Sequence, residues 1–292
     1  AADAWMMALI EHGTMSFEQV VTPALEYARD GIAVGATLAK SMASFAEQAK
    51  QWPTRTEAFT EDGQFPELGE SLRQPALART FERLIDVERS NISLGRERAI
   101  QAARDFFYRE EIAEEIVSFV QDGGGFLSMS DMEDFSVGHE PPETGRFNEY
   151  EVYTNGPWSQ GPAFAEAVQL LASDDLARLR HNTADYVHLV AESLKLSFSD
   201  RDAFYGDPDF VDIPLRGLLS EDYTRVRRQD IDPNRAWAAM PEAGDPWRFE
   251  GRSQPAGYAY EPPPPVDGNS EPDTSYACVV DRWGNMFSAT PS

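Results

Sequence analysis

The sequence predicts an α+β protein, and three features of its pattern carry that prediction. Apolar residues recur at helical spacing through about two thirds of the chain. Residues 150–154 form an internal segment with strand character. A stretch rich in Pro, Gly, Asp and Glu, 228–273, then separates the helices from two strand-like segments near the end. Helices followed by strands in this order are typical of the α+β class.

The expected helices are marked by their caps and by apolar spacing. Residues 1–11 and 34–50 are predicted helices. Ser16 and Gln19 have the spacing of a capping box. Thr22 with Pro23 then predicts a helix start with a threonine cap and a proline at the first position. Ser130 is expected to cap a short helix, and Thr183 a long one. Further helices are expected around 77–85, 106–120 and 163–172, with a loop over 51–75.

The end of the chain has the pattern of a β-hairpin. Residues 276–280 alternate between two sides, and 286–290 is predicted as the return strand. Asp281–Asn285 supplies the Gly and Asn that a tight turn favours. Cys278, the single cysteine, excludes an internal disulfide and is expected to be a small core residue of the first strand.

Composition excludes several classes of partner. The formal net charge is −25, from 50 acidic and 25 basic residues, and phosphate contacts need Lys and Arg, so we expect no nucleic acid partner. No apolar run reaches ~18 residues, so no membrane span is expected. The four histidines are scattered and there is no CxxC pair, so we expect no metal and no cofactor.

Thr274 is the strongest candidate for chemistry. It stands at the first position of the predicted hairpin, directly after the Pro-rich segment. If the chain is cut before it, Thr274 gains a free α-amine, which has a pKa near 7.7–8.0 and can take the proton of its own hydroxyl. The alternative is a threonine that merely begins a strand after a linker.

Two other constellations have plainer interpretations beside functional ones. Gly156–Gly161 follows a strand and precedes a helix, so it either presents backbone N–H groups to a ligand or forms an ordinary turn. The acids at 200–202 and 207–209 predict a charged helix end and turn, since a calcium loop needs more ligands at alternate positions.

Several separated stretches, in one order along the whole chain, resemble the γ-glutamyltransferase (glutathione hydrolase) family. They are His12–Met15, Val20–Ala24 with Ala28–Gly31, Gly124–Ser128, Pro157–Gly161, Ala191–Arg201, Gly206–Val211 and Asp273–Asn285.

The resemblance implies an αββα N-terminal-nucleophile hydrolase fold, with this chain supplying mostly the helical layer and the first small-subunit strands. Thr274 matches the residue before which such precursors cut themselves, so autocleavage between Asp273 and Thr274 is expected. Ser292 matches a second family threonine that hydrogen-bonds the nucleophile, and Thr290 matches another. The implied reaction transfers a γ-glutamyl group from glutathione or a related amide to water, an amino acid or a peptide.

The resemblance also implies how the protein is divided. Residues 1–273, with a flexible tail over 228–273, would belong to a large subunit and 274–292 to the start of a small one, the two forming a heterodimer from one precursor. Both ends look cut, so we expect an internal fragment that is inactive alone, with the family's remaining substrate-binding residues before Ala1 and after Ser292. A periplasmic or extracellular location is expected from the family.

The sequence departs from the family pattern at positions that bear on the substrate. Asp273 stands where the family usually has Asn, Ser275-Tyr276 where it has Thr-His, and Trp158 and Gln160 where it often has Ser and Gly. The alternatives are therefore another amide hydrolase of this fold, acylase-like or oxamate-amidase-like, or a non-catalytic helical binding domain.

Overall fold

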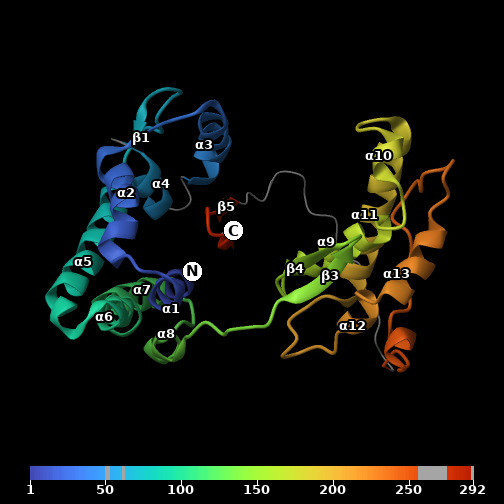
Figure 1. Ribbon diagram of the computed structural model, residues 1–292. Coiled ribbons are helices and arrows are strands. Elements are labelled where there is room, and N and C mark those ends of the chain that lie inside the picture. Colours follow the sequence, from blue (N-terminus) through green and yellow to red (C-terminus); the bar gives the residue numbers. More distant parts are fainter. Residues whose placement is uncertain (50–52, 61–62, 256–274, 291–292) are drawn as a thin grey trace. The chain divides into compact units, whose positions relative to one another are not determined.

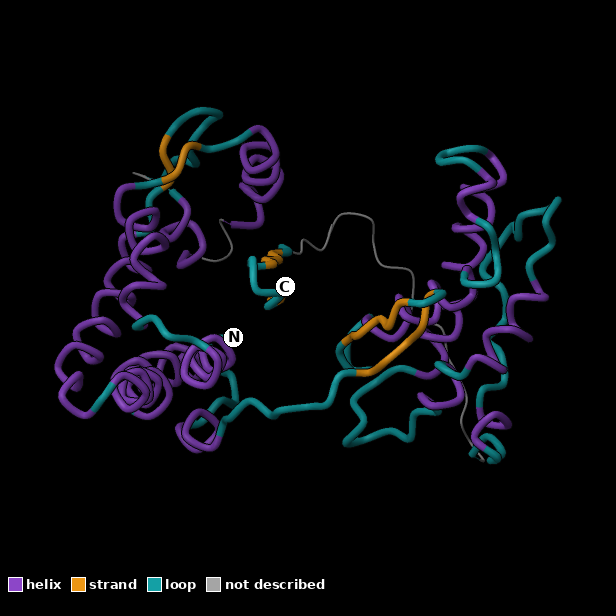
Figure 2. Tube along the Cα trace, in the orientation of Figure 1, coloured by secondary structure: helices purple, strands orange, loops and turns teal. Residues whose placement is uncertain are grey.

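The computed structural model describes residues 1–49, 53–60, 63–255 and 275–290. Its residues form two compact units, 1–138 and 139–290. Within the described ranges the strands form three separate two-stranded antiparallel sheets among many helices (Figure 2), in agreement with the predicted α+β class. No helix in these ranges is long and apolar enough to cross a membrane.

The first unit is almost entirely helical (Figure 1). α5 packs on both α2 and α6, while α6 also contacts α1 and α7. Its central apolar cluster comes from four of these helices: Met6, Leu84, Ile100, Ala103, Phe106 and Ile112. The elements are α1 (Ala2–His12), α2 (Phe17–Asp30), β1 (Ile32–Ala33), α3 (Ala36–Ala49), α4 (Pro53–Phe59), β2 (Ser71–Leu72), α5 (Pro75–Asn91), η1 (Ile92–Leu94), α6 (Arg96–Arg109), α7 (Glu111–Asp122) and α8 (Met129–Asp134).

The predicted start of the second helix at Thr22 and Pro23 is wrong. α2 begins at Phe17, and Pro23 lies inside it. Ser16 is the cap, since its hydroxyl accepts from the Gln19 amide while the Gln19 side chain accepts from the Ser16 amide, which completes a capping box. Thr22 instead donates its hydroxyl to the Glu18 carbonyl at 2.6 Å.

A buried carboxylate from another helix adds to this start. Glu88 of α5 is 2% exposed and accepts from the Phe17 amide at 2.7 Å and the Glu18 amide at 2.8 Å. These are amides of the first turn of α2, which have no partner within their own helix. A negative charge at a helix N-terminus is also favoured by the helix dipole. The contact spans about 70 residues of sequence, so local spacing could not predict it.

Two smaller expectations for this unit are also corrected. The predicted loop over 51–75 contains α4 and the strand β2, which pairs Leu72 with Ile32 and Ser71 with Ala33. Ser128, rather than Ser130, caps α8, because its hydroxyl accepts from the Asp131 amide. The helix predicted over 34–50 is confirmed as α3, with residue 50 outside the described ranges.

The second unit combines two hairpins, two longer helices and several short helices and turns. Its elements are β3 (Glu143–Phe147), β4 (Tyr150–Thr154), α9 (Gly161–Leu171), α10 (Leu176–Leu179), α11 (Ala184–Phe204), α12 (Leu215–Leu218), α13 (Glu221–Arg227), η2 (Arg228–Asp230), η3 (Trp247–Glu250), β5 (Ala277–Val280) and β6 (Met286–Ala289). The predicted Thr183 cap is confirmed, since its hydroxyl accepts from the Tyr186 amide.

α9 is the centre of this unit: it packs on the β3–β4 hairpin and on α11 (Figure 1). A Cβ at Gly145 of β3 would lie 2.9 Å from the Ala165 Cβ, so this close approach requires glycine. The described part of the predicted irregular segment, 228–255, has only short 3₁₀ turns. It is nevertheless packed, because Trp247 is fully buried against Phe204 and Leu218.

Candidate active site

The hairpin at the end of the chain carries the predicted nucleophile region. β5 pairs antiparallel with β6 through Ala277–Ala289, Cys278–Ser288, Val279–Phe287 and Val280–Met286. Its turn is held by the Asp281 carboxylate, which accepts from the Trp283 amide at 2.8 Å and the Asn285 amide at 2.9 Å. The Asn285 side chain also donates to it at 2.8 Å, and these contacts lower the pKa of Asp281. Gly284 has a φ of 87°, which favours glycine at this turn.

The two faces of the hairpin differ in chemistry. Residues opposite each other in an antiparallel pair point to the same side. One face therefore carries Cys278 and Ser288, and Ser288 donates its hydroxyl to the Tyr276 oxygen at 3.2 Å, which places Tyr276 there too. The other face carries small and apolar side chains, among them Val279 and Phe287. The Tyr276 and Ser288 hydroxyls thus share one face of the hairpin, together with the apolar pair Val280 and Met286.

The structure describes only one of the four predicted site residues. Thr290 is described, exposed and directly after β6. Asp273, Thr274 and Ser292 lie outside the described residues, so the expectations that Thr274 begins a strand and that it contacts Ser292 stay predictions. Cys278, expected in the core, is exposed. The expectation was wrong because strand alternation predicts a side of the sheet and not what covers that side.

The Gly156–Gly161 turn connects β4 to α9 through internal hydrogen bonds. The Ser159 amide donates to the Gly156 carbonyl at 3.0 Å, and the Gly161 amide donates to the Ser159 hydroxyl at 3.2 Å. Two side chains tie the turn to its surroundings: Trp158 donates to Glu140 at 2.7 Å, and Arg201 donates to Gln160 at 2.7 Å. The two departures from the family pattern, Trp158 and Gln160, therefore each have a specific polar partner.

Sequence reasoning missed a buried acidic pair in the same unit. Asp200 of α11, expected at a charged helix end, is fully buried and accepts from Tyr223 at 2.5 Å and the Gly244 amide at 2.7 Å. Arg227 also donates to it at 3.3 Å. Glu166 of α9 is buried beside Asp200, and none of the described groups donates to either of its oxygens. Burial, and then the neighbouring Asp200 charge, raise the pKa of Glu166 well above its ordinary value and so favour its protonated form.

The signal for this pair was present but weak. Glu166 is the one acid in the apolar segment predicted as the helix 163–172, so its only neighbours on that helix are core residues. A lone acid on the apolar face of a helix is buried when that face packs. Because a buried charge is costly, the acid then either pairs with a cation or hydrogen-bond donor or stays protonated. Neither the partner on α11 nor Tyr223 on α13 could be identified from spacing.

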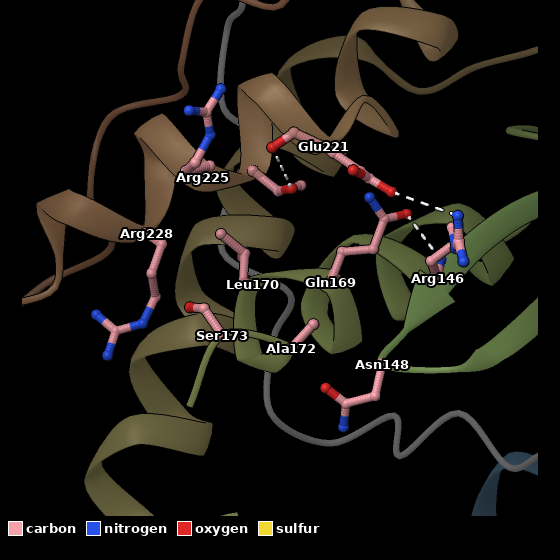
Figure 3. A pocket seen from close by; sticks show the side chains of 10 residues that line it. Arg146, Asn148, Gln169, Leu170, Ala172, Ser173, Glu221, Arg225 and Arg228 are labelled. Atoms are coloured by element: carbon pink, nitrogen blue, oxygen red, sulfur yellow. Dashed lines mark hydrogen bonds and ion pairs between the residues drawn. The ribbon is translucent and has the colours of Figure 1, made fainter. Parts of the chain in front are cut away.

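A pocket of about 390 Å³ lies between the β3–β4 hairpin, α9 and α13 (Figure 3). Three arginines line it, but each is paired with an acid. Arg228 makes two bonds to Asp174 at 2.8 and 2.9 Å, Arg225 pairs with Asp222, and Arg146 lies 3.8 Å from Glu221. The pocket therefore has no excess of positive charge. Among the residues that the structure describes, no group of His, Cys, Asp and Glu is arranged to hold a metal ion.

Comparisons with known proteins agree with the family resemblance. The family model described as Gamma-glutamyltranspeptidase matches residues 1–292. The chain is 30% identical over 284 residues to the glutathione hydrolase proenzyme of Bacillus subtilis (strain 168), covering 97% of this chain and 45% of that protein. The chain thus spans less than half the length of this curated relative.

Solved structures give the same result at the level of the fold. The structure of LmbA2991HD matches with a TM-score of 0.81 and 33% identity, covering 99% of this chain and 50% of that chain. The cephalosporin acylase from Bacillus halodurans matches with a TM-score of 0.71 and 26% identity, covering 85% of this chain and 44% of that one. These matches confirm the predicted α+β fold of N-terminal-nucleophile hydrolases.

Proposed function

The chain belongs to the gamma-glutamyltranspeptidase family, and we propose that the full-length protein cleaves γ-glutamyl amides through an ester on Thr274. The γ-glutamyl group would come from glutathione or a related amide and pass to water or to the amine of an amino acid or peptide. The family match and the curated glutathione hydrolase relative support the reaction class.

The register of the hairpin is the observation that supports this proposal most directly. The pairing ends at Ala277–Ala289, and continued by one pair it would set Tyr276 opposite Thr290. Continued by two more, it would set Thr274 opposite Ser292. Side chains of directly opposite residues have Cβ atoms about 4.5–5.5 Å apart and share a face. The two hydroxyls would then be close enough for Ser292 to orient Thr274.

The chemistry follows from a threonine at a new N-terminus. The neutral α-amine of Thr274 takes the hydroxyl proton, directly or through one water, as Oγ attacks the amide carbonyl of the substrate. The C–N bond breaks, the leaving amine takes a proton, and the γ-glutamyl group stays on Oγ as an ester. Water or an acceptor amine then attacks the ester, and Thr274 regains its proton.

The same hydroxyl would first release that N-terminus. Thr274 Oγ attacks the carbonyl carbon of Asp273, and the peptide bond is exchanged for an ester with the amine set free. Water hydrolyses the ester, leaving a carboxylate on Asp273 and a free hydroxyl on Thr274. The products would be a large subunit that includes 1–273, with the segment 228–273 as its tail, and a small subunit that begins at 274. We propose that they remain together as a heterodimer.

Intact mass spectrometry of the full-length protein tests this proposal. The wild type is expected to give two chains divided between Asp273 and Thr274, and Thr274→Ala one uncut chain. The processed protein is then expected to release the aniline from a γ-glutamyl anilide. A wild type that stays uncut would favour the alternative of a non-catalytic helical domain. Cleavage at another bond would exclude Thr274 as the nucleophile.

A second candidate, an acylase for other amides, is favoured by one observation. The cephalosporin acylase structure overlaps this chain at 26% identity, comparable to the curated relatives. The two candidates share the nucleophile and differ in the acyl group. Processed protein that cleaves a glutaryl amide at least as fast as a γ-glutamyl amide would support the acylase, because glutaryl lacks only the α-amino group.

A further inference from the structure

A groove of about 460 Å³ lies in the second unit, between the chain entering β3, the turn after β4 and residues 208–215. It is distinct from the hairpin of the proposed site and from the arginine-lined pocket. Most of its walls are apolar: Pro141, Pro157, Pro208, Val211, Ile213 and Leu215. Apolar walls with a few polar groups are typical of small-molecule sites.

Two carboxylates without an ion-pair partner among the described residues line this groove, the exposed Glu140 and the partly buried Glu143. Glu140 accepts one hydrogen bond, from the Trp158 indole at 2.7 Å. Glu143 also lines the groove, and no described residue donates a hydrogen bond to it or forms an ion pair with it. Burial, and then the charge of Glu140, raise the pKa of Glu143. A third acid, Asp212, is already paired with Arg252 at 2.8 and 3.2 Å.

The electrostatics of the groove therefore favour a positive charge from outside. Two like charges beside apolar walls raise the free energy of the ionised state, and a cation between them lowers it. Arg252, the described cation that pairs with a residue of the groove lining, is engaged by Asp212 and Glu250. Charge complementarity thus points to a cationic ligand and away from an anion or a neutral molecule.

Trp158 adds a second kind of contact for such a ligand. Its side chain lines the groove and is 55% exposed, while its N–H is held by Glu140. Tryptophan is the aromatic side chain that attracts ammonium and guanidinium groups best. The bond to Glu140 fixes the ring next to the carboxylates, so ring and charges can act on one group.

We propose that this groove binds an organic cation, a primary ammonium carried on a short apolar chain. The ammonium contacts Glu143, Glu140 and the Trp158 ring, and the chain lies along the proline, valine, isoleucine and leucine walls. This site is independent of Thr274 and does not depend on the proposed reaction.

Calorimetric titration of the full-length protein with n-butylammonium tests the proposal, at ~0.15 M salt to screen its large negative charge. Saturable binding at one site is expected for n-butylammonium, with none for n-butanol or butyrate of the same chain length. If the wild-type protein binds n-butanol as well as n-butylammonium, or does not bind n-butylammonium, the proposal is overturned.

Substitutions then locate the site. Glu143→Gln keeps the shape and removes the charge, and is expected to weaken binding about 10-fold, the usual scale for a lost charged hydrogen bond. Glu149→Gln, an exposed change on the same hairpin, is the matched control and should alter binding by less than about 2-fold. Equal effects of the two substitutions would mean that only the overall charge attracts the ligand.

The nuclear magnetic resonance signal of the Trp158 indole N–H gives a second readout. It is expected to shift on titration with n-butylammonium and to stay in place with n-butanol. Loss of that shift in Glu143→Gln, with the other indole signals unchanged, separates a local site from unfolding. An unshifted signal at saturating ligand would overturn the placement in this groove.

Discussion

Tyr223 donates its phenolic hydrogen to the Asp200 carboxylate over 2.5 Å, and in doing so connects α13 to the middle of the second unit. Asp200 also accepts from Arg227 and the Gly244 amide, while Glu166 lies beside it without a described donor. The negative charge of Asp200 is thus compensated by these donors, whereas a negative charge on Glu166 would have no described donor. The cluster is stable with Glu166 protonated.

We predict that Glu166→Gln stabilises the protein at neutral and alkaline pH. Because the folded-state pKa of Glu166 is raised above its ordinary value of 4.5, the folded protein keeps a proton that the unfolded chain loses. Wild-type stability therefore falls as pH rises from ~4.5, by up to ~1.4 kcal/mol per pH unit until the folded-state pKa is reached. Glutamine cannot ionise, so the variant does not lose stability in this way as pH rises.

Thermal unfolding of both proteins between pH 4 and 8 measures this. The difference in Tm should be near zero at pH 4 and grow with pH in favour of the variant. The exposed Glu149→Gln is the control and should show no such trend. A constant difference at every pH, or a variant less stable at pH 8, would contradict a protonated Glu166.

The first unit gives a prediction about its buried carboxylate. Glu88→Gln should lower the free energy of unfolding by about 1–3 kcal/mol, because one of the two amides it accepts from would then face an N–H₂ group. Denaturant unfolding followed by helical circular dichroism measures the loss. Glu82→Gln, exposed on the same helix, should change stability by less than ~0.5 kcal/mol. Equal effects would mean that Glu88 does not cap α2.

The proposed active site gives a prediction for Ser292. In the full-length enzyme Ser292→Ala should lower kcat by ~10-fold or more, because the Thr274 hydroxyl loses a group that orients it. Processing and thermal stability should be close to wild type, since the change removes one hydroxyl. Steady-state kinetics on a γ-glutamyl anilide measure the effect. A variant with normal processing and wild-type kcat would remove Ser292 from the site.

The hairpin turn gives a prediction about processing. Asp281→Ala removes three hydrogen bonds to Trp283 and Asn285, which loosens the register that would bring Thr274 opposite Ser292. Autocleavage should slow by about 10-fold, equivalent to ~1.4 kcal/mol in the barrier. The time course of precursor disappearance measures this, with Arg282→Ala in the same turn as the control. Equal rates for Asp281→Ala and wild type would show that the turn does not control processing.

Local sequence rules worked where the deciding contacts are local. Thr183 caps α11 through an amide three residues away, and Asp281 closes its turn through amides two and four residues away. Period-2 alternation likewise predicted the hairpin, whose pairing the structure confirms. These contacts form between near neighbours in the chain, so residue type and spacing are sufficient to predict them.

The same rules failed where a distant side chain decided the outcome. Glu88 accepts from the first amides of α2 from another helix, which spacing could not predict, while the start of α2 itself follows the local Ser16–Gln19 capping box and not Thr22–Pro23. β3 was not predicted, because a five-residue strand with Gly145 at its centre is recognised only by its partner β4 and by α9 behind it.

By itself, the sequence determined the α+β class, the Thr183 helix cap, the terminal hairpin and the family, because these follow from local spacing and from motifs in one order. Tertiary structure alone decided which charges are buried and which are unpaired. Glu166, Asp200 and Glu143 are ordinary acids in the sequence, and their protonation and pairing depend on groups 3 to 61 residues away that only folding brings near. Solvation and Coulomb energies depend on distance in space, and for these acids spacing along the chain does not give that distance.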